Sequence, residues 1–314
     1  MSAERSAAIG WTAAELAADP HWVLQADAAL GPAMAALTRW ATGQRDPLDA
    51  LVVPGASDAG PALGLLRHWC APLLHQLEQG RGIARVTGLQ HLEEGQVRLL
   101  FLAIGRLLGQ PDRTYGLLYS VSDSGQSHLD RPIPVSQTRA ATGMHTDSSQ
   151  RTVHPRWVGL ACVRPAASGG ASAVASARAV HTHLLSTQPE LVARLRRPFI
   201  RDVVTPGGDR RRAVIKANAF PIFAGSLEDP TLRYMRHWIE TGQREAGQPL
   251  GPRDLADLDA LDAALTSERF RHAFLLAPGD LLFVDNHRLA HDRTAYVDDP
   301  ERPRLLLRLW VNAS

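Results

Sequence analysis

Hydrophobic and polar positions follow a helical period through the first third of this chain of 314 residues. Leu, Ala and Val recur at steps of three and four, which predicts amphipathic helices over 25–42, 61–79 and 93–108. Residues 12–15 (TAAE) have the form of a capping box that opens a short helix. Between the last two long helices, the segment 82–89 (GIARVTGL) is expected to form a strand.

The pattern changes after residue 114, where strand-like runs alternate with helical ones. Apolar runs predict strands at 157–165 and 171–177, and the closing segments HAFLLAPGDLLFVDNHRLAHDRTAY and RLLLRLWV predict two further β-rich blocks. Helices are expected over 177–195 with a break at Pro189, and then over 229–246 and 253–266. Helices that frame separated β-rich blocks indicate an α+β domain whose sheet is assembled from distant segments.

Composition narrows the class of protein without identifying it. A formal charge of +2 gives no reason to expect nucleic-acid or membrane affinity, and 45% hydrophobic residues are typical of a soluble globular protein. Two cysteines exclude a disulfide framework and a thiolate zinc site. No apolar run approaches the length of a membrane span, and no leader-like segment opens the sequence. We expect a cytoplasmic protein that binds a small molecule and that could form a homo-oligomer.

Candidate chemistry begins with GMHTDSSQ, residues 143–150. On a strand, His145 and Asp147 would point to the same face and could hold one metal ion. This spacing is common by chance, and a second copy occurs at His128 and Asp130. The spacing alone therefore does not select one pair.

The final β-rich block supplies a further histidine. LLFVDNHRLAHDRT carries His287 and His291 directly after an apolar run. His145, Asp147 and His291 would complete a site of two His and one carboxylate, the facial triad of non-haem Fe(II) oxygenases, whose open positions accept a cosubstrate and dioxygen. Each histidine considered by itself could equally be a hydrogen-bonded core or surface residue.

Two arginines on the last predicted strand strengthen the oxygenase interpretation. Arg304 and Arg308 lie four apart in RLLLRLWV, so a strand presents both on one face. A buried guanidinium needs an anion, and its planar fork suits a carboxylate. A 2-oxoacid would chelate iron with its keto-acid end and reach Arg304 with its distal carboxylate. An edge strand with a solvated face is the alternative.

These segments carry a family resemblance. GMHTDSSQ through PRWVGLACVRPAASGGASAVASARAVH, with GDLLFVDNHRLAHDRTAY and RPRLLLRLWV, resembles the taurine dioxygenase (TauD/TfdA), clavaminate synthase-like family of Fe(II)/2-oxoglutarate-dependent oxygenases. The two blocks cover about 110–205 and 268–312, roughly half the chain. Their occurrence together and in order is more specific than either motif.

The resemblance implies roles for individual residues. Iron falls on His145, Asp147 and His291, which leaves the pair at 128 and 130 without a role. Arg304 would bind the distal carboxylate of 2-oxoglutarate, helped by a hydroxyl that follows the Gly-Gly turn. Here this hydroxyl belongs to Ser172, where many relatives have threonine. Arg308 matches a position that contacts the cosubstrate in some members and the substrate in others.

The resemblance also implies the fold. It predicts a double-stranded β-helix, a cupin-like jelly-roll of two facing sheets with helices outside. We therefore expect a single oxygenase domain over 1–314, with a helical flank at 1–110 and a jelly-roll core at 111–314 that contains a helical insertion at about 178–266.

The implied reaction couples oxidative decarboxylation of 2-oxoglutarate by dioxygen to hydroxylation of an aliphatic C–H bond. Asp147 is retained where halogenating relatives have a small residue, so halogenation is not expected. Desaturation or cyclisation uses the same triad. A zinc hydrolase with the same ligands and a non-catalytic jelly-roll that binds a small acid are alternatives of other classes.

The resemblance implies a small substrate, since the family members most similar to this sequence act on amino acids or on intermediates of natural-product biosynthesis. Gln137 and Arg139 are candidate substrate contacts because they lie in the polar loop before the metal pair. Arg210 and Arg212 lie in a basic loop that is either a lid over an anionic substrate or a solvated surface. Asp285 and Asn286 precede the distal histidine and are expected to orient ligands from behind, alongside Arg288.

Overall fold

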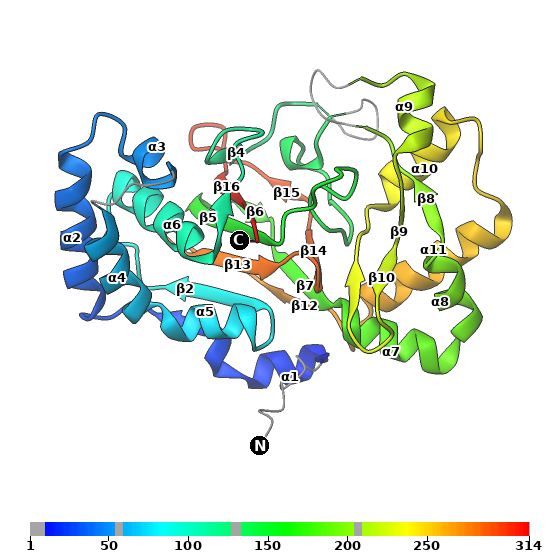
Figure 1. The fold of residues 1–314 in the computed structure, drawn as a ribbon, viewed down its shortest axis with the longest axis horizontal. Helices are drawn as coiled ribbons and strands as arrows, with labels where there is room; N and C mark the ends of the chain where they lie inside the picture. Colours follow the sequence, from blue (N-terminus) through cyan, green and yellow to red (C-terminus); the bar gives the residue numbers. More distant parts are fainter. Residues whose placement is uncertain (1–9, 54–58, 127–132, 204–208, 314) are drawn as a thin grey trace.

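The computed structural model describes residues 10–53, 59–126, 133–203 and 209–313, and it arranges them in layers of helices and sheets (Figure 1). The described part of the chain combines one large sheet, a second sheet of three strands and two groups of helices. The pair His128 and Asp130 lies outside the described residues. No helix among these residues has both the length and the apolar character needed to cross a membrane.

The large sheet is antiparallel except at one edge. Its strand order is β1-β2-β13-β5-β16-β3, with β4 also paired to β16 and with β1 parallel to β2. Its described strands are β1 Val23–Gln25, β2 Ile83–Thr87, β3 Gln110–Pro111, β4 Tyr119–Val121, β5 Trp157–Arg164, β13 Leu281–Asp285 and β16 Leu305–Asn312. Strands from the middle and the end of the chain are thus neighbours, as the separated β-rich blocks predicted.

The smaller sheet has the order β12-β7-β14, formed by His272–Phe274, Ser172–Ser176 and Leu289–Arg293. Two-stranded ribbons join β6 Ser168–Gly169 to β15 Tyr296–Val297, β8 Pro198–Ile200 to β9 Ala219–Pro221, and β10 Phe223–Gly225 to β11 Pro230–Leu232. The ribbons of β8 to β11 lie inside the region that the sequence predicted to be a helical insertion.

Two groups of helices cover the sheets from opposite sides (Figure 1). The first group comprises α1 Ala13–Ala18, α2 Leu30–Thr42, α3 Pro47–Val52, α4 Gly60–Trp69, α5 Ala71–Glu78 and α6 Glu94–Leu108. The second comprises α7 Ala177–Thr187, α8 Pro189–Leu195, α9 Arg212–Ala217, α10 Arg236–Glu245 and α11 Pro252–Thr266. The capping box at Thr12 and the helix break at Pro189 are confirmed.

Several boundaries differ from the sequence predictions. The helix predicted over 25–42 begins only at Leu30, and Gln25 belongs to β1. The helix predicted over 61–79 is two helices that meet at Cys70. The helix predicted over 229–246 begins only at Arg236, because the residues before it form β11. The basic loop predicted around Arg210 and Arg212 is in part the helix α9, which begins at Arg212.

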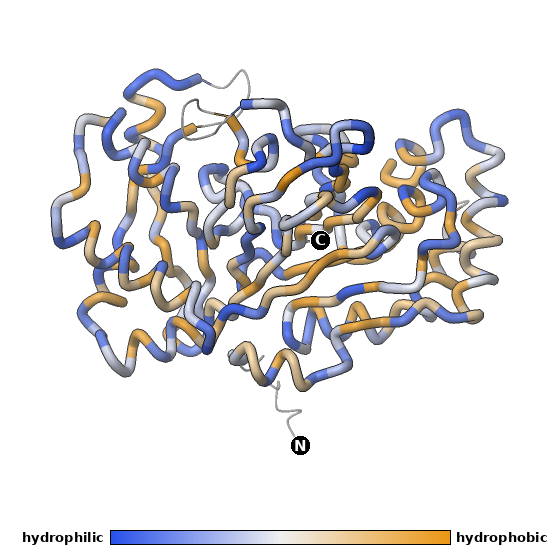
Figure 2. Tube along the Cα trace, turned by 180° about the vertical axis from the view of Figure 1, so that it is seen from behind, coloured by the Kyte–Doolittle hydropathy of each residue, from blue (hydrophilic) through white to orange (hydrophobic). Residues whose placement is uncertain are grey.

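Alternating side chains of the strands build separate cores on the two faces of each sheet. On β5, Val158 and Cys162 pack with Val174 of the smaller sheet in the interior between the sheets. Trp157 and Ala161 point the other way and pack with α6 and its neighbours. The smaller sheet turns residues such as Ala173 toward α7 and the second group of helices. Hydrophobic segments accordingly concentrate in the inner strands (Figure 2).

Gly159 lies where α6 presses against β5. A Cβ at this position would lie 2.8 Å from ring atoms of Phe101 and 3.0 Å from Phe283, both fully buried. We expect Gly159→Ala to lower the free energy of unfolding by about 1–3 kcal/mol through overpacking. Urea denaturation provides the measurement.

Gly64 on α4 is the matched control, because a Cβ there meets nothing within 4 Å. Gly64→Ala should raise stability by up to about 1 kcal/mol through helix propensity. Equal stability changes in both variants would contradict the close packing of α6 on the sheet.

Candidate functional site

A short backbone bridge joins the two parts of the site. The N–H of His145 donates to the carbonyl of His291 at 2.9 Å, and the reverse hydrogen bond has the same length. This isolated antiparallel pair continues the smaller sheet beyond β14. The two histidines, which are separated by 146 positions in the sequence, are thereby held side by side, and their ring centroids lie 4.4 Å apart.

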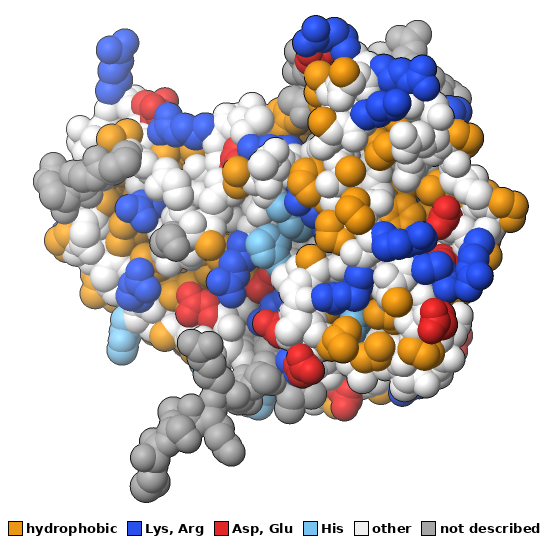
Figure 3. Space-filling model, turned by 45° about the vertical axis from the view of Figure 1, so that its right-hand side comes forward, with side chains coloured by type: hydrophobic (Ala, Val, Ile, Leu, Met, Phe, Trp, Pro, Cys, Tyr) orange, Lys and Arg blue, Asp and Glu red, His pale blue; other side chains and the backbone are white. Residues whose placement is uncertain are grey.

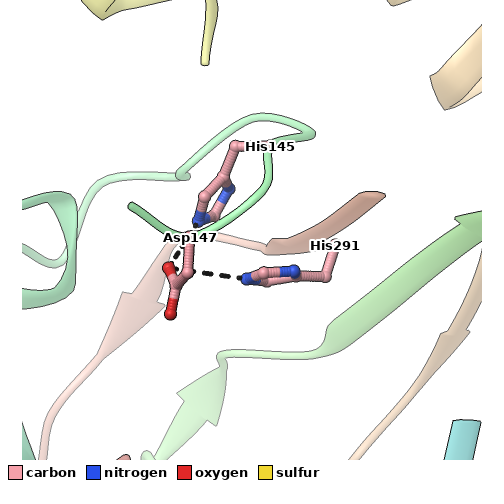
Figure 4. Close-up of side chains that lie close together, drawn as sticks. All are labelled: His145, Asp147 and His291. Atoms are coloured by element: carbon pink, nitrogen blue, oxygen red, sulfur yellow. Dashed lines mark ion pairs between the residues drawn. The ribbon is translucent and has the colours of Figure 1, made fainter. Parts of the chain in front are cut away.

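Asp147 completes the cluster (Figure 4). Its Oδ1 lies 3.6 Å from Nε2 of His145 and 3.8 Å from Nε2 of His291, and the three ligand atoms lie within 4.8 Å of one another. These separations are too long for hydrogen bonds and suit atoms that share one metal ion. His145 and Asp147 are buried, and His291 is nearly so.

The electrostatics favour the protonation states of metal ligands. Burial raises the pKa of Asp147, but the charge of Arg308 and the adjacent imidazoles outweigh burial and hold this pKa well below its usual value. Burial, with the neighbouring His145, lowers the pKa of His291. An ionised carboxylate beside a neutral imidazole is the state that binds a divalent metal.

The second oxygen of Asp147 is held on the opposite side. Trp310 donates its indole N–H to Oδ2 at 2.7 Å, and Nη1 of Arg308 lies 3.3 Å from the same atom. Nη1 of Arg308 also donates to Oδ1 at 3.4 Å, and Oδ1 is the oxygen that faces the two histidines. An arrangement in which Asp147 offers one oxygen keeps further coordination positions of a bound metal open for other ligands.

Asn286 fixes the backbone of Asp147. Its Oδ1 accepts a hydrogen bond from the Asp147 N–H at 2.8 Å, and its Nδ2 donates to the Asp147 carbonyl at 3.1 Å. Nδ2 also donates to the carbonyl of Pro155 and lies 3.0 Å from Nε2 of His154. The following residue, Ser148, has φ +55°, and it is the only described non-glycine residue with positive φ. The chain therefore leaves the site through a constrained turn.

Two adjoining cavities meet at the cluster. The first, here called the arginine cavity, holds about 500 Å³ of space and is lined by Ser172, His291, Arg293, Arg304 and Arg308, among others. The second, here called the aromatic cavity, holds about 640 Å³ including its open mouth and is lined by aromatic and hydroxyl side chains. His145, Asp147 and Arg308 line both cavities.

The arginine cavity contains guanidinium groups without anionic partners. Arg293 and Arg304 are 7% and 4% exposed, and neither forms an ion pair within the described parts of the chain. Nη1 of Arg304 and Nε of Arg293 have no hydrogen-bond partner there, and both guanidiniums lie over the ring of Tyr296. Burial lowers the pKa of Arg304 and lowers that of Arg293 to about 10. Buried charge of this kind calls for an anionic ligand.

Most residues predicted to form the site lie at the two cavities. Ser172, Arg304 and Arg308 line the arginine cavity, and Gln137 lines the aromatic cavity, where its Nε2 donates to the Tyr119 hydroxyl at 2.6 Å. Asn286 holds the backbone of Asp147, whereas the buried Asp285 accepts a hydrogen bond from the N–H of His287. Burial raises the pKa of Asp285.

The structure does not bring the other predicted substrate contacts to the cavity walls. Arg139 is exposed and pairs with Asp123 at 2.8 Å. Arg210 pairs with Asp202 at 2.6 Å, and Nε of Arg212 donates to the carbonyl of Ala246. The basic side chains on the face shown in Figure 3 are likewise dispersed in several groups, some beside acidic ones.

Arg293 and Trp310 are among the site residues that were not predicted from the sequence. Arg293 lies two residues after His291 on β14, and Trp310 lies two residues after Arg308 on β16. The two-residue period of a strand was the available signal, because it places each beside a residue already assigned to the site.

The fold and the cluster define a class of protein. Two histidines and a carboxylate beside an anion-binding cavity, in a fold of mixed helices and sheets, are typical of non-haem iron oxygenases. Residues 55–310 match the model of the taurine catabolism dioxygenase TauD, TfdA family, and the chain belongs to this family. It is accordingly a dioxygenase, which is an oxidoreductase, and its cluster of two histidines and a carboxylate could hold iron.

Relatives are found among curated proteins and solved structures. The FR-33289 synthase of Streptomyces rubellomurinus (strain ATCC 31215) is 26% identical over 77% of this chain and 72% of its own length. A uridine-5'-phosphate dioxygenase from Streptomyces sp is 36% identical over 57% of this chain and 65% of its own length.

Two solved structures share the fold. Asparagine oxygenase in complex with Fe(II), 3-hydroxyasparagine and succinate has a TM-score of 0.71 and 19% identity, and covers 93% of each chain. The non-heme iron oxygenase OrfP with Fe and alpha-ketoglutaric acid has a TM-score of 0.64 and 17% identity over 93% of this chain and 94% of its own.

The indole of Trp310 provides a test of the carboxylate's orientation. Trp310→Phe keeps a ring but removes the N–H that holds Oδ2 of Asp147. We expect Fe(II) affinity to fall by roughly tenfold to a hundredfold, as for other groups that orient metal ligands. Equilibrium dialysis of Fe(II) under anaerobic conditions provides the measurement.

Trp11→Phe is the control, because Trp11 is also buried and donates its indole N–H to the carbonyl of Arg81. It should retain the Fe(II) affinity of the parent. Undiminished affinity in Trp310→Phe, or an equal loss in both variants, would contradict the role of the indole.

Proposed function

We propose that this dioxygenase hydroxylates an aliphatic C–H bond of a small polar substrate, with iron held by His145, Asp147 and His291. The observation that carries the proposal is the juxtaposition of this cluster with the unpaired guanidinium of Arg304 in one cavity. A metal site alone would suit a hydrolase, and a buried cation alone would suit an acid-binding module. A metal site combined with a buried, unpaired guanidinium suits an oxygenase that consumes a metal-chelating dicarboxylate.

The same cavity accommodates the cosubstrate in this proposal. Arg304, with its unpartnered Nη1, binds the distal carboxylate of 2-oxoglutarate, and Ser172 on β7 offers a hydroxyl at the cavity wall. Arg308 lines the same cavity and pairs with Asp147, whose carboxylate its charge keeps ionised. Bound iron, together with 2-oxoglutarate and dioxygen, supplies the oxidising power for C–H cleavage.

The protein's own side chains confine this chemistry. The arginine cavity combines its cations with apolar walls from Val121, Val158 and Leu306, so a bound dicarboxylate excludes water from the metal's side of the site. Asp147 occupies the position that halogenating members leave open for chloride, which supports hydroxylation over halogenation. Desaturation or cyclisation would use the same residues.

Relatives guide the substrate class. The curated relatives include an FR-33289 synthase and a uridine-5'-phosphate dioxygenase, both from Streptomyces. The similar solved structures contain hydroxylated asparagine and hydroxylated arginine. We infer an amino acid or an intermediate of natural-product biosynthesis as the substrate.

We also infer a double-stranded β-helix for the core. The facing sheets, with an interior core between Val158 and Val174 and helices on both outer sides, support this architecture. One oxygenase domain over 1–314 is consistent with it, with a helical flank at 1–110 and an insertion at about 178–266.

Arg304 is the residue to test for cosubstrate binding. Adding 2-oxoglutarate to the anaerobic Fe(II) protein should produce a weak visible charge-transfer band. Arg304→Ala should raise the dissociation constant for 2-oxoglutarate by roughly 30-fold or more, because the distal carboxylate loses its charged partner. Titration at the wavelength of the band measures this constant.

Arg164→Ala is the matched control, because Arg164 ends the adjacent strand β5 and bonds to the carbonyl of Pro303 outside the cavity. Its band should match that of the parent. A normal titration in Arg304→Ala would refute the assignment of the carboxylate site.

The metal ligands are tested by iron content after anaerobic reconstitution. His145→Ala and His291→Ala should lose stoichiometric iron and all 2-oxoglutarate turnover, whereas His75→Ala, an exposed change on α5, should keep both. Zinc binding with oxygen-independent turnover in the parent would favour a hydrolase. Acid binding without turnover in the parent would favour a binding module.

A further inference from the structure

The walls of the aromatic cavity come from two apolar groups. On one side, the ring of Tyr115 lies 5.3 Å from that of Trp310 and 6.1 Å from that of Tyr119. On the other side, Met235 and Trp238 pack with Val135 in a small buried cluster of their own. All these residues line the cavity, so an occupant would lie against aromatic and apolar surfaces.

Two serines that line this cavity have hydroxyl groups without partners. Ser148 and Ser149 are 8% and 1% exposed, and the Oγ of each is buried without a hydrogen bond in the described structure. Both serines line the aromatic cavity and are not among the residues that line the arginine cavity. Since buried hydroxyls are normally satisfied, these two point to a ligand with hydrogen-bonding atoms.

The two cavities differ in charge. Among the described residues that line the aromatic cavity, Arg308 is the only lysine or arginine, and it is already paired with Asp147 at 3.3 Å. The arginine cavity has Arg293 and Arg304 in addition, without carboxylate partners. An anionic group is therefore better accommodated in the arginine cavity, and the aromatic cavity suits an uncharged group.

We propose that the substrate presents an uncharged heteroaromatic ring, of the kind found in nucleobases, to the aromatic cavity. The ring lies against the aromatic walls, and its polar edge bonds to the hydroxyls of Ser148 and Ser149. This inference rests on the proposed function and specifies the substrate class of the same site. The inference concerns the ring of a nucleotide-like substrate and not its phosphate, because the described walls of the aromatic cavity offer a phosphate no unpaired lysine or arginine.

Binding to the anaerobic Fe(II)–2-oxoglutarate complex tests the inference. Uridine and adenosine should each perturb the charge-transfer band, and uridine 5'-phosphate should bind within a few-fold of uridine. L-Asparagine and L-arginine should bind more weakly than the nucleosides. The band itself reports the proposed oxygenase site before any nucleoside is added, so a failure of that site is distinguished from a failure of this inference.

Variants of the cavity walls sharpen the test. Ser149→Ala and Trp238→Leu should each weaken nucleoside binding by roughly tenfold, through loss of a hydrogen bond or of a stacking surface. Trp238→Phe, which keeps a ring, should bind nearly as well as the parent. In all three variants the band without nucleoside should be unchanged, which excludes misfolding.

Three results would overturn the inference. The first is an unperturbed band with both nucleosides. The second is uridine 5'-phosphate binding more than about tenfold tighter than uridine, a difference that a direct charged contact to the phosphate would produce. The third is tighter binding of either amino acid than of the nucleosides.

Discussion

The site depends on the reciprocal backbone hydrogen bonds between His145 and His291. They join a loop from the middle of the chain to a strand near its end, and they place both imidazoles on the same side. Asn286, on the turn that leads into β14, then holds the backbone of Asp147 from behind. All three residues of the cluster are therefore oriented by main-chain contacts before any ligand is considered.

Around this bridge, one carboxylate links the metal cluster to both cavities. Asp147 faces the histidines with one oxygen and Trp310 with the other, and Arg308 contacts both oxygens. The charge of Arg308, at the edge of the arginine cavity, thus also keeps the carboxylate of Asp147 ionised. The aromatic cavity lacks the two unpaired arginines of the arginine cavity, and its remaining walls are mainly hydroxyls and rings.

Sequence reasoning reached the elements with a clear period and the residues with a distinctive chemistry. The helix at 93–108 and the strand at 157–165 were predicted nearly to their ends, because α6 and β5 keep one period throughout. The helix predicted over 229–246 was too long at its start, because apolar residues of β11 fall in phase with the helix α10 that follows. Ion pairs were less accessible: Arg210 pairs with Asp202, eight residues earlier, and its charge is therefore already balanced. Trp310 in an apolar strand gives the same signal as a core residue, and only the fold shows its indole at Asp147.

The aromatic cavity is built largely from segments that carry no residue of the metal cluster. Tyr115 and Tyr119 belong to the segment around β4, Val135 to the turn before the cluster, and Met235 and Trp238 to the start of α10. Mutations in these segments can reshape the space for a substrate while β14 and β16 continue to hold the histidine and the arginines. Such a division makes the protein evolvable, because substitutions in the peripheral segments can change the substrate specificity while the residues around the metal cluster stay unchanged.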